Sequence, residues 1–334
     1  MSAADQLQGL TLDGGWVVQK RLPHQPTTGG VFSVPYVVVD NDGKEHFLKA
    51  LDFSRAFEPG RDTFRELENM TSIYNHERDI LEHCKARGLS RVVVAVSHGY
   101  VQVPGFVIEA GRVSYLIFEM AESDVRRQVD AGNRIDCLSC LSILNDVTLG
   151  LMQLHREQIA HQDLKPSNVL TYGNDGCRVA DFGRSSRRGR DIWVDELKIA
   201  GDPSYAPPEQ QYSHTHGDFV VRRIGCDLYL LGNLAAFLFT GINMTAALFS
   251  RMDPALCPQN WAGTYEQVLP HLQRAFADAV ADISASIDPL VRDQITTLVR
   301  ELCNPDLSKR DIGKVSGAAA NIRLNATNHT LIYC

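Results

Sequence analysis

Two neighbouring motifs, His161-Gln-Asp-Leu-Lys-Pro-Ser-Asn168 (HQDLKPSN) and Asp181-Phe-Gly183, decide which fold this chain adopts. Between them, residues 169–170 and 177–180 predict two short strands, and Asn174-Asp175-Gly176 predicts the turn that joins them, because Asp-Gly tolerates a positive φ. The motifs therefore flank a β-hairpin, and polar side chains from both are expected to meet at its mouth.

These side chains suit a phosphate and its counter-ion. Asp163, Asn168 and Asp181 offer oxygen ligands, which magnesium prefers and usually shares with phosphate oxygens. Lys165 adds a positive charge two residues after Asp163, suited to stabilising a migrating phosphoryl group. The plainer alternative is a solvated loop in which Asn and Asp only form turns.

The first third of the chain, to about Met120, predicts mainly strands. Strand-like stretches occupy residues 16–22, 36–40, 45–51, 91–96 and 113–118. Asn41-Asp42-Gly43-Lys44 predicts a hairpin turn between the second and third of these.

Helices dominate after about Met120, and the first third also predicts one helix. After a polar stretch over residues 52–70, the pattern predicts a helix over residues 73–87 that ends at Gly88. Residues 137–156 carry leucines on one face and predict another helix. A strand-rich part followed by a helix-rich part predicts an α+β fold with a ligand-binding cleft between two lobes.

Length and composition limit the class of protein. The 334 residues suggest about two domains or lobes, and 44% hydrophobic residues with a net charge of −7 argue against a disordered chain. The longest apolar run, residues 228–239, is shorter than the ~20 residues that a bilayer requires and predicts a buried helix. Residues 1–12 lack the pattern of a secretory signal, and the mild acidity argues against nucleic acid as main partner.

The eight cysteines are too few for a disulfide scaffold in a chain of this length, so we expect a reducing, cytoplasmic location. Cys137 and Cys140 have CxxC spacing, but no second pair completes a zinc site, and both lie in a predicted helix. Ordinary core or surface thiols are favoured over metal or redox chemistry.

The HQDLKPSN and Asp-Phe-Gly motifs resemble those of the eukaryotic-like protein kinase family, with Gln162 in place of the usual arginine. The resemblance implies a bilobal α+β kinase fold: an N-terminal extension (1–15), an N-lobe (16–120) and a C-lobe (121–334) with the activation segment at 181–209. It also implies transfer of the γ-phosphoryl group of ATP to protein substrates. Lys-Pro after Asp-Leu is the form of this loop in Ser/Thr kinases.

The resemblance assigns a role to each residue of the two motifs. Asp163 is implied as catalytic base, and Lys165 would steady the transferred phosphoryl group. Asn168 would hold one magnesium ion and Asp181 the other, with manganese as an alternative ion.

The resemblance also implies the nucleotide contacts. Lys49 on the strand over residues 45–51 would bind the α- and β-phosphates and pair with a helix glutamate, for which Glu77 is favoured over the three competitors Glu66, Glu68 and Glu82. Adenine would meet the hinge after Phe118, and Asp124 would bind the ribose or cap a helix. The implied cofactor-binding residues are Lys49, Gly30, Phe32, Glu119, Ala121, Asp124 and Leu170.

Further motifs continue the resemblance toward the C-terminus. Residues 201–209 (GDPSYAPPE) resemble the end of an activation segment. Asp227 would begin a buried helix that braces the catalytic loop, and Arg310 would pair with Glu209.

The sequence departs from the family pattern at four places. Only Gly30 is clearly retained from the glycine-rich loop, and Phe47 replaces an alanine that touches adenine, which predicts weaker nucleotide binding. Gln162 carries no charge to bind a phosphorylated loop, so we expect activity that does not depend on loop phosphorylation, with Ala at Ser185 and Ser186 tolerated. Asp202 would pair with Lys165, repel Asp163 or lie on the surface.

Three functions remain to be weighed. An active protein Ser/Thr kinase is favoured because every catalytic position is filled. A pseudokinase that only binds or scaffolds is the first alternative, supported by the altered glycine loop. A small-molecule kinase is the second, and the segment 201–209 argues against it.

Overall fold

The computed structural model describes residues 2–23, 33–57, 60–107, 111–130, 135–190 and 192–310. The chain forms two compact units. Unit 1 comprises Met1–Glu122 together with Asp181–Gly183, and unit 2 comprises Ser123–Ala180 with Arg184–Cys334.

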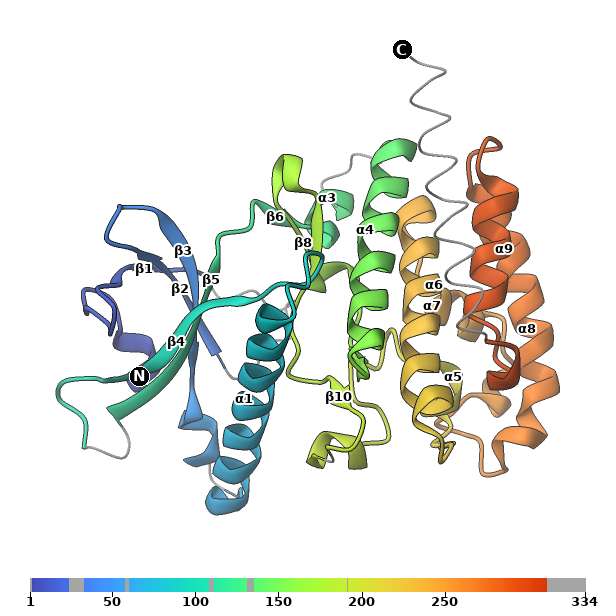
Figure 1. Cartoon of the computed structure of the whole chain (residues 1–334). Coiled ribbons are helices and arrows are strands. Elements are labelled where there is room, and N and C mark those ends of the chain that lie inside the picture. Colours follow the sequence, from blue (N-terminus) through green and yellow to red (C-terminus); the bar gives the residue numbers. More distant parts are fainter. Residues whose placement is uncertain are drawn as a thin grey trace, which may run out of the picture. The chain divides into compact units, whose positions relative to one another are not determined.

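Unit 1 is built on a five-stranded antiparallel sheet with the order β1-β2-β3-β5-β4 (Figure 1). Its strands are β1 (Val17–Arg21), β2 (Ser33–Val39), β3 (Glu45–Leu51), β4 (Ala95–Gln102) and β5 (Arg112–Glu119). The predicted hairpin is confirmed, because Val39 pairs with Glu45 and Gly43 has a φ of 79° in the turn between them.

The strand predicted over residues 91–96 is wrong in its position. Val92 and Val93 are buried but precede the sheet, and β4 runs from Ala95 to Gln102. Its inner and outer residues alternate, as expected of a strand with one solvated face, so it has no continuous apolar run. Pairing with β5, which a sequence window does not contain, determines where it begins and ends.

The helix predicted over residues 73–87 begins ten residues earlier than expected, as α1 (Thr63–Ala86). Asp62 caps it, since its side chain accepts a hydrogen bond from Arg65 N at 3.2 Å. The first turns show no apolar stripe because they are largely exposed; Phe64, for example, is 86% exposed. The predicted end is confirmed at Gly88, which has a φ of 64°.

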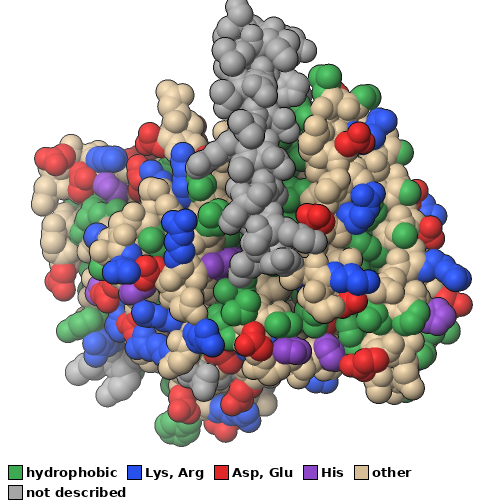
Figure 2. All heavy atoms as spheres, turned by 45° about the vertical axis from the view of Figure 1, so that its right-hand side comes forward, with side chains coloured by type: hydrophobic (Ala, Val, Ile, Leu, Met, Phe, Trp, Pro, Cys, Tyr) green, Lys and Arg blue, Asp and Glu red, His purple; other side chains and the backbone are tan. Residues whose placement is uncertain are grey.

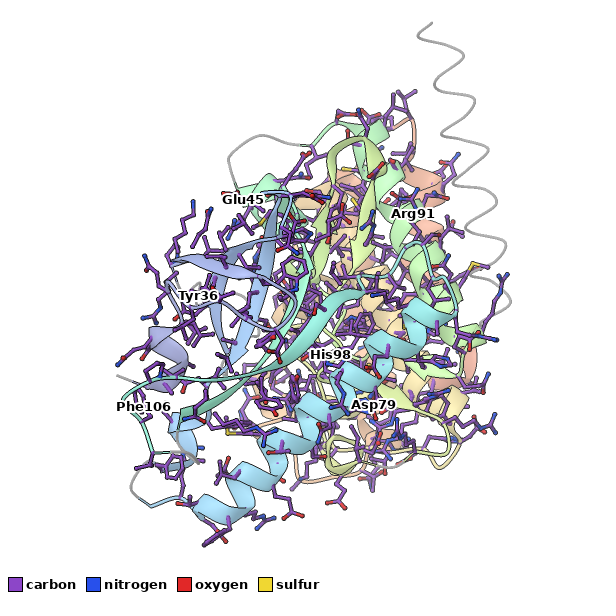
Figure 3. All side chains as sticks on the ribbon, turned by 60° about the vertical axis from the view of Figure 1, so that its left-hand side comes forward. Tyr36, Glu45, Asp79, Arg91, His98 and Phe106 are labelled. Atoms are coloured by element: carbon purple, nitrogen blue, oxygen red, sulfur yellow. The ribbon has the colours of Figure 1, made fainter. Side chains whose placement is uncertain are left out.

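Residues at the N-terminus form part of the core of unit 1. The short helix η1 (Ala3–Gln6) lies against the sheet, and the Tyr36 hydroxyl, labelled in Figure 3, donates to Ala4 O at 2.7 Å. Leu7 and Leu12 are buried in the same cluster as the inner face of the sheet. The segment expected as an extension therefore supports the sheet directly.

We expect Leu7→Ala to destabilise unit 1 by about 2–5 kcal/mol, because the side chain is fully buried and its removal leaves a cavity. Urea denaturation compared with Leu10→Ala, a partly buried neighbour in the same cluster, measures this loss. Equal losses for the two variants would contradict a core role for the N-terminal segment.

Unit 2 consists mainly of helices, with two small antiparallel sheets, β10-β7 and β6-β8-β9. Its α-helices are α3 (Val125–Asp130), α4 (Cys137–Arg156), α5 (Pro208–Gln211), α6 (Gly225–Thr240), α7 (Met244–Ser250), α8 (Tyr265–Ser286) and α9 (Arg292–Leu302). Its strands are β6 (Ser123–Asp124), β7 (Ile159–Ala160), β8 (Val169–Thr171), β9 (Cys177–Val179) and β10 (Ser186–Arg187). The predicted α+β class is confirmed.

The long apolar helices of unit 2 form its core. α6 is buried from Gly225 to Leu238, as predicted, and α4 and α9 lie on either side of it in Figure 1. A Cβ at Gly232 would lie 2.6 Å from Cys303 Sγ, so this glycine lets α6 and the end of α9 approach closely. By length and composition, two parts of the described chain could cross a membrane: α4, and the bent pair formed by residues 220–240 and 244–250. However, 56% of the apolar stretch of α4 is buried inside the protein.

Charged side chains of both signs occur across the face shown in Figure 2, between polar and hydrophobic ones. The chain as a whole is acidic, with 40 Asp and Glu against 33 Lys and Arg.

Candidate active site

Asp163 lies at the centre of a polar cluster in unit 2, between β7 and the short helix η3 (Pro166–Asn168). It is only 6% exposed. Its Oδ1 accepts a hydrogen bond from Asp202 N at 2.7 Å, and its Oδ2 accepts one from Asn168 Nδ2 at 3.2 Å. Lys165 Nζ lies 3.3 Å from the same Oδ2. The sequence motif thus brings three of the predicted residues, Asp163, Lys165 and Asn168, into direct contact.

The backbone of this loop is held by Asp227 at the start of α6. Asp227 is fully buried and accepts hydrogen bonds from His161 N at 2.8 Å and Gln162 N at 2.7 Å. His161 Nδ1 accepts from Asp163 N, so Nε2 carries the proton and donates to Ala180 O at 2.9 Å. The bracing predicted for Asp227 is confirmed.

His155 is a further member of this arrangement that sequence reasoning missed. Its Nε2 lies 2.8 Å from Asp227 Oδ2. In the sequence it is only a basic residue in the last turn of a helix, and no spacing signal connects it to Asp227.

Asp202 pairs with Lys165, which is one of the three alternatives predicted for this residue, beside repulsion of Asp163 and a place on the surface. Its Oδ2 lies 3.3 Å from Lys165 Nζ. Burial acts to raise the pKa of Asp202, but hydrogen bonds from Ser204 and the charge of Lys165 outweigh it, so this pKa is lowered. The segment that carries Asp202 can lie this close to the loop around Asp163 because residue 201 is a glycine. A Cβ at Gly201 would lie 2.4 Å from Gln162 O and 2.7 Å from Asp163 Oδ1.

The lowered pKa of Asp202 predicts a pH-dependent contribution to stability. Because the folded value lies below the unfolded value of about 3.9, the contribution is present above that pH and is lost as the pH falls through the folded value. The side chain is 31% exposed, so we expect Asp202→Asn to lower the free energy of unfolding at pH 7 by only about 0.5–1 kcal/mol. Urea denaturation at pH 7 and at about pH 2.5, below the unfolded pKa of Asp, should show the gap narrowing, and a constant gap would contradict this account.

Lys49 on β3 forms an ion pair with Glu77 on α1, inside unit 1. Lys49 Nζ lies 2.9 and 3.0 Å from the two carboxylate oxygens of Glu77, and 3.4 Å from Asp181 Oδ1. Glu77 is therefore the helix partner, as the sequence favoured. Of the competitors, Glu66 lies near Arg61, and Glu82 lies 2.7 Å from His98.

The position of α1 beside the sheet makes this ion pair possible. In Figure 3, His98 on β4 lies next to α1, where its Nε2 meets Glu82. The Tyr74 hydroxyl on α1 donates to Tyr115 O at 3.3 Å. These contacts fix the rotation of α1 and so direct Glu77 toward Lys49.

The charge of Lys49 is strongly favoured. Burial disfavours its ammonium form, but the carboxylates of Asp181 and Glu77 outweigh burial and raise the pKa of Lys49 above its ordinary value. Asp181 itself has a φ of 69°, a left-handed conformation that Asp tolerates better than most residues. Unit 1 therefore holds a fixed positive charge between two carboxylates.

Asn168 and Asp181 each offer an oxygen ligand of the kind that a magnesium ion prefers. Asn168 donates through Nδ2 to Asp163 O at 2.8 Å, which leaves its carbonyl Oδ1 as an oxygen ligand. Asp181 offers a carboxylate. Within the described part of the chain, no group of three or more His, Cys, Asp or Glu side chains forms a metal site, and magnesium characteristically needs only one or two protein carboxylates because phosphate and water complete its shell.

The structure describes some of the predicted nucleotide-binding residues but not all of them. Asp124 caps the turn that follows it, since its Oδ1 accepts from Arg127 N at 3.0 Å, so the capping alternative is observed. Glu119 ends β5, Ala121 follows it, and Leu170 lies on β8, all partly exposed. The predicted contacts of Gly30 and Phe32 lie outside the described residues.

The predicted pair of Glu209 and Arg310 is present and buried. The two guanidinium nitrogens of Arg310 lie 2.7 and 2.8 Å from the two carboxylate oxygens of Glu209. Arg310 Nε also donates to Asn304 O at 2.6 Å. Such two-point contacts are strong and geometrically specific.

The CxxC pair belongs to a helix of the core. Cys140 is buried, and its Sγ donates to Leu238 O on α6. Burial raises the pKa of Cys140 to about 12, which keeps it a thiol. Cys140 therefore acts as a small core residue.

Comparison with known proteins now identifies the family. The family model described as "Protein kinase domain" matches residues 30–311, which is most of the chain. The chain belongs to the protein kinase domain family. The family implies use of ATP, typically with a divalent metal ion.

The kinase is similar over part of its length to several named proteins. It is 31% identical over 152 residues to "Serine/threonine-protein kinase greatwall" of Bos taurus, covering 45% of this chain and 16% of that protein. It is 35% identical over 101 residues to "Calcium/calmodulin-dependent protein kinase kinase cmkC" of Emericella nidulans, covering 29% of this chain and 20% of the relative. The kinase thus spans only a small part of these longer relatives.

Proposed function

We propose that this kinase transfers the γ-phosphoryl group of ATP to serine or threonine hydroxyls of protein substrates. The observation that carries the proposal is the buried cluster of Asp163, Lys165 and Asn168 in unit 2. The Lys165-Pro166 form of the loop and the names of the similar proteins support serine or threonine as acceptor.

Asp163 is proposed as the group that accepts the proton of the substrate hydroxyl. Its Oδ1 is held by Asp202 N, and Asn168 and Lys165 both lie at Oδ2, so the carboxylate has a fixed orientation. A positioned base of this kind contributes about 10²–10⁴-fold to a rate. Lys165 is proposed to offset negative charge on the migrating group, because its ammonium lies 3.3 Å from Oδ2 of the proposed base.

Lys49 is proposed to bind the α- and β-phosphates from unit 1. Its ion pair with Glu77 holds the ammonium in one place, and burial of Glu77 makes that pair costly to disrupt.

Magnesium would be held at two places, one ion by Asn168 Oδ1 and another by the Asp181 carboxylate. When bound, it neutralises phosphate charge and aligns the transferred group. The chain's own contribution is to present these two oxygens in fixed conformations, through the Asn168–Asp163 hydrogen bonds and the left-handed backbone at Asp181.

The cell compartment and the partners are proposed on chemical grounds. Seven cysteines in the described part of the chain are free thiols, and free thiols suit a reducing compartment such as the cytoplasm. Protein substrates are the proposed partners.

Incubation with labelled ATP and magnesium tests the proposal. We expect label in generic protein acceptors, recovered as phosphoserine or phosphothreonine, and loss of labelling when magnesium is chelated. Lys49→Met should reduce the rate by about 10²-fold or more, because it removes a fixed phosphate ligand. Lys44→Met, on the exposed turn that leads into β3, is the matched control and should leave the rate unchanged.

Two outcomes would contradict the proposal. Binding of ATP without transfer to any protein would favour a pseudokinase that only binds or scaffolds. Transfer to a small molecule but to no protein would favour the small-molecule alternative.

A further inference from the structure

Four side chains of unit 2 close a ring of hydrogen bonds next to the catalytic loop. Gln162 Nε2 donates to Ser186 Oγ at 2.5 Å, and Ser186 Oγ donates to Asp195 Oδ1. Arg223 NH2 lies 2.9 Å from the same Asp195 oxygen, and Arg223 NH1 donates to Gln162 Oε1 at 2.6 Å. These four residues, Gln162, Ser186, Asp195 and Arg223, are named the anchor ring here.

Three of the four residues of the anchor ring are buried, Asp195 is partly exposed, and the ring connects three parts of the chain. Gln162, Ser186 and Arg223 are 2%, 1% and 4% exposed, respectively. Gln162 directly precedes the proposed base Asp163, Ser186 and Asp195 lie in the predicted activation segment, and Arg223 lies just before α6. The ring therefore ties the segment after residue 184 to the catalytic loop and to the main helix of unit 2.

Asp195 is fixed by more than the ring. Its Oδ2 accepts from Ile192 N at 3.1 Å, and its carbonyl oxygen accepts from Arg222 NH2 at 2.9 Å and from Arg223 NH2 at 2.8 Å. The turn around Asp195 is thus held through both its side chain and its backbone. A carboxylate with this many donors has little freedom to leave.

The ring explains why glutamine suits position 162. Its amide donates through Nε2 and accepts through Oε1, and both are needed to close the ring. An arginine has only donors, so it has no acceptor to offer the guanidinium of Arg223. Gln162 also adopts a φ of 62°, unfavourable for a residue with a Cβ, which the ring and the bonds to Asp227 offset.

We propose that the anchor ring replaces activating phosphorylation in this kinase. In kinases with an arginine before the catalytic Asp, that arginine binds a phosphate on the activation loop. Here the arginine comes from position 223, and it pairs with the carboxylate of Asp195 in place of a phosphate. Asp195, Arg223 and Gln162 are positioning residues that hold the activation segment and the orientation of Asp163. The proposal rests on the proposed function.

Ser186 gains a different role from the one the sequence suggested. Its hydroxyl is buried, accepts a hydrogen bond from Gln162 and donates one to Asp195. In β10, Ser186 pairs with Ala160 on β7. A phosphate there would meet the Asp195 carboxylate, and like charges repel. Under this proposal Ser186→Ala is expected to reduce activity by opening the ring, in contrast to the tolerance expected from the sequence.

Phosphatase treatment and four variants test the proposal. Enzyme stripped of phosphate, as checked by intact mass, should keep its rate within about twofold. Arg223→Met should increase hydrogen exchange in peptides covering residues 184–200 and lower kcat at least tenfold, with the KM for ATP changed less than threefold. Ser186→Ala is a milder second probe of the same ring. Arg188→Met, at an exposed arginine of the same segment, is the control and should change neither readout.

Exchanging two side chains separates positioning from general structural damage. In the double variant Gln162→Arg with Arg223→Gln, the guanidinium approaches Asp195 from position 162 and the amide from position 223. We expect it to recover at least one-third of the wild-type kcat, well above Arg223→Met.

Three results would overturn the proposal. These are a tenfold loss of rate on removal of phosphate, unchanged hydrogen exchange in Arg223→Met and Ser186→Ala, and a double variant no more active than Arg223→Met. If the wild type transfers no phosphoryl group at all, the proposed function fails. The exchange measurement still reports on the ring in that case.

Discussion

Asp163→Asn is expected to lower kcat for phosphoryl transfer by about 10²–10⁴-fold, the range of a positioned general base. Asparagine keeps the shape of the side chain and one carbonyl oxygen that accepts from Asp202 N, where Asp163 Oδ1 accepts at 2.7 Å. It loses the negative charge beside Lys165 and the ability to take a proton. The KM for ATP should change little, because Asp163 is proposed to act on the acceptor hydroxyl.

Initial rates with labelled ATP and a protein acceptor measure this effect. Asp175→Asn, in the exposed turn between β8 and β9, is a control that changes an aspartate of the same hairpin outside the cluster. Thermal melting of both variants checks that the fold is kept. A kcat within threefold of wild type for Asp163→Asn would remove Asp163 from the role of base.

Arg310→Met is expected to destabilise unit 2 by about 3–5 kcal/mol, because it leaves a buried carboxylate on Glu209 without its partner. Both side chains are almost inaccessible, at 0% and 5% exposure, and Glu209 meets both nitrogens of the guanidinium. Losing that much stability would leave a marginal protein largely unfolded near physiological temperature.

A double variant distinguishes pairing from packing. Adding Glu209→Gln to Arg310→Met removes the orphaned charge, so the double variant should be less destabilised than the sum of the single ones. Arg300→Met on the exposed side of α9 is the control and should cost under about 0.5 kcal/mol. Additive losses in urea denaturation would mean that the pair is not coupled.

Sequence patterns located most elements, and where they failed, contacts distant in sequence explain why. α4 has the predicted bounds, and the hairpin around Gly43 and the buried helix α6 are also as predicted. β4 was misplaced because its pairing with β5, and not an apolar run, sets its limits. The start of α1 was missed because its first turns are exposed and lack periodicity.

The candidate site was predictable only as far as its motifs reach. Asp163, Lys165 and Asn168 lie within one short motif, and the partners Glu77 and Arg310 followed from the resemblance. His155 and Arg223 were missed, because each acts through a residue more than 60 positions away and has no local signature. The missing charge at Gln162 predicted activity without loop phosphorylation. That Arg223 lies beside Gln162 could be found only from the structure.

The assignment of Asp181–Gly183 to unit 1 also constrains how this gene can evolve. The chain completes Met1–Glu122, builds part of unit 2, and then returns to supply the carboxylate that lies 3.4 Å from Lys49. A recombination event that exchanged only residues 1–122 would replace Lys49 and Glu77 with their equivalents from another protein. Asp181, which lies 3.4 Å from Lys49, would stay behind and meet a lysine with which it did not evolve. The two units therefore cannot be shuffled as separate modules, and we expect them to be inherited and to diverge together.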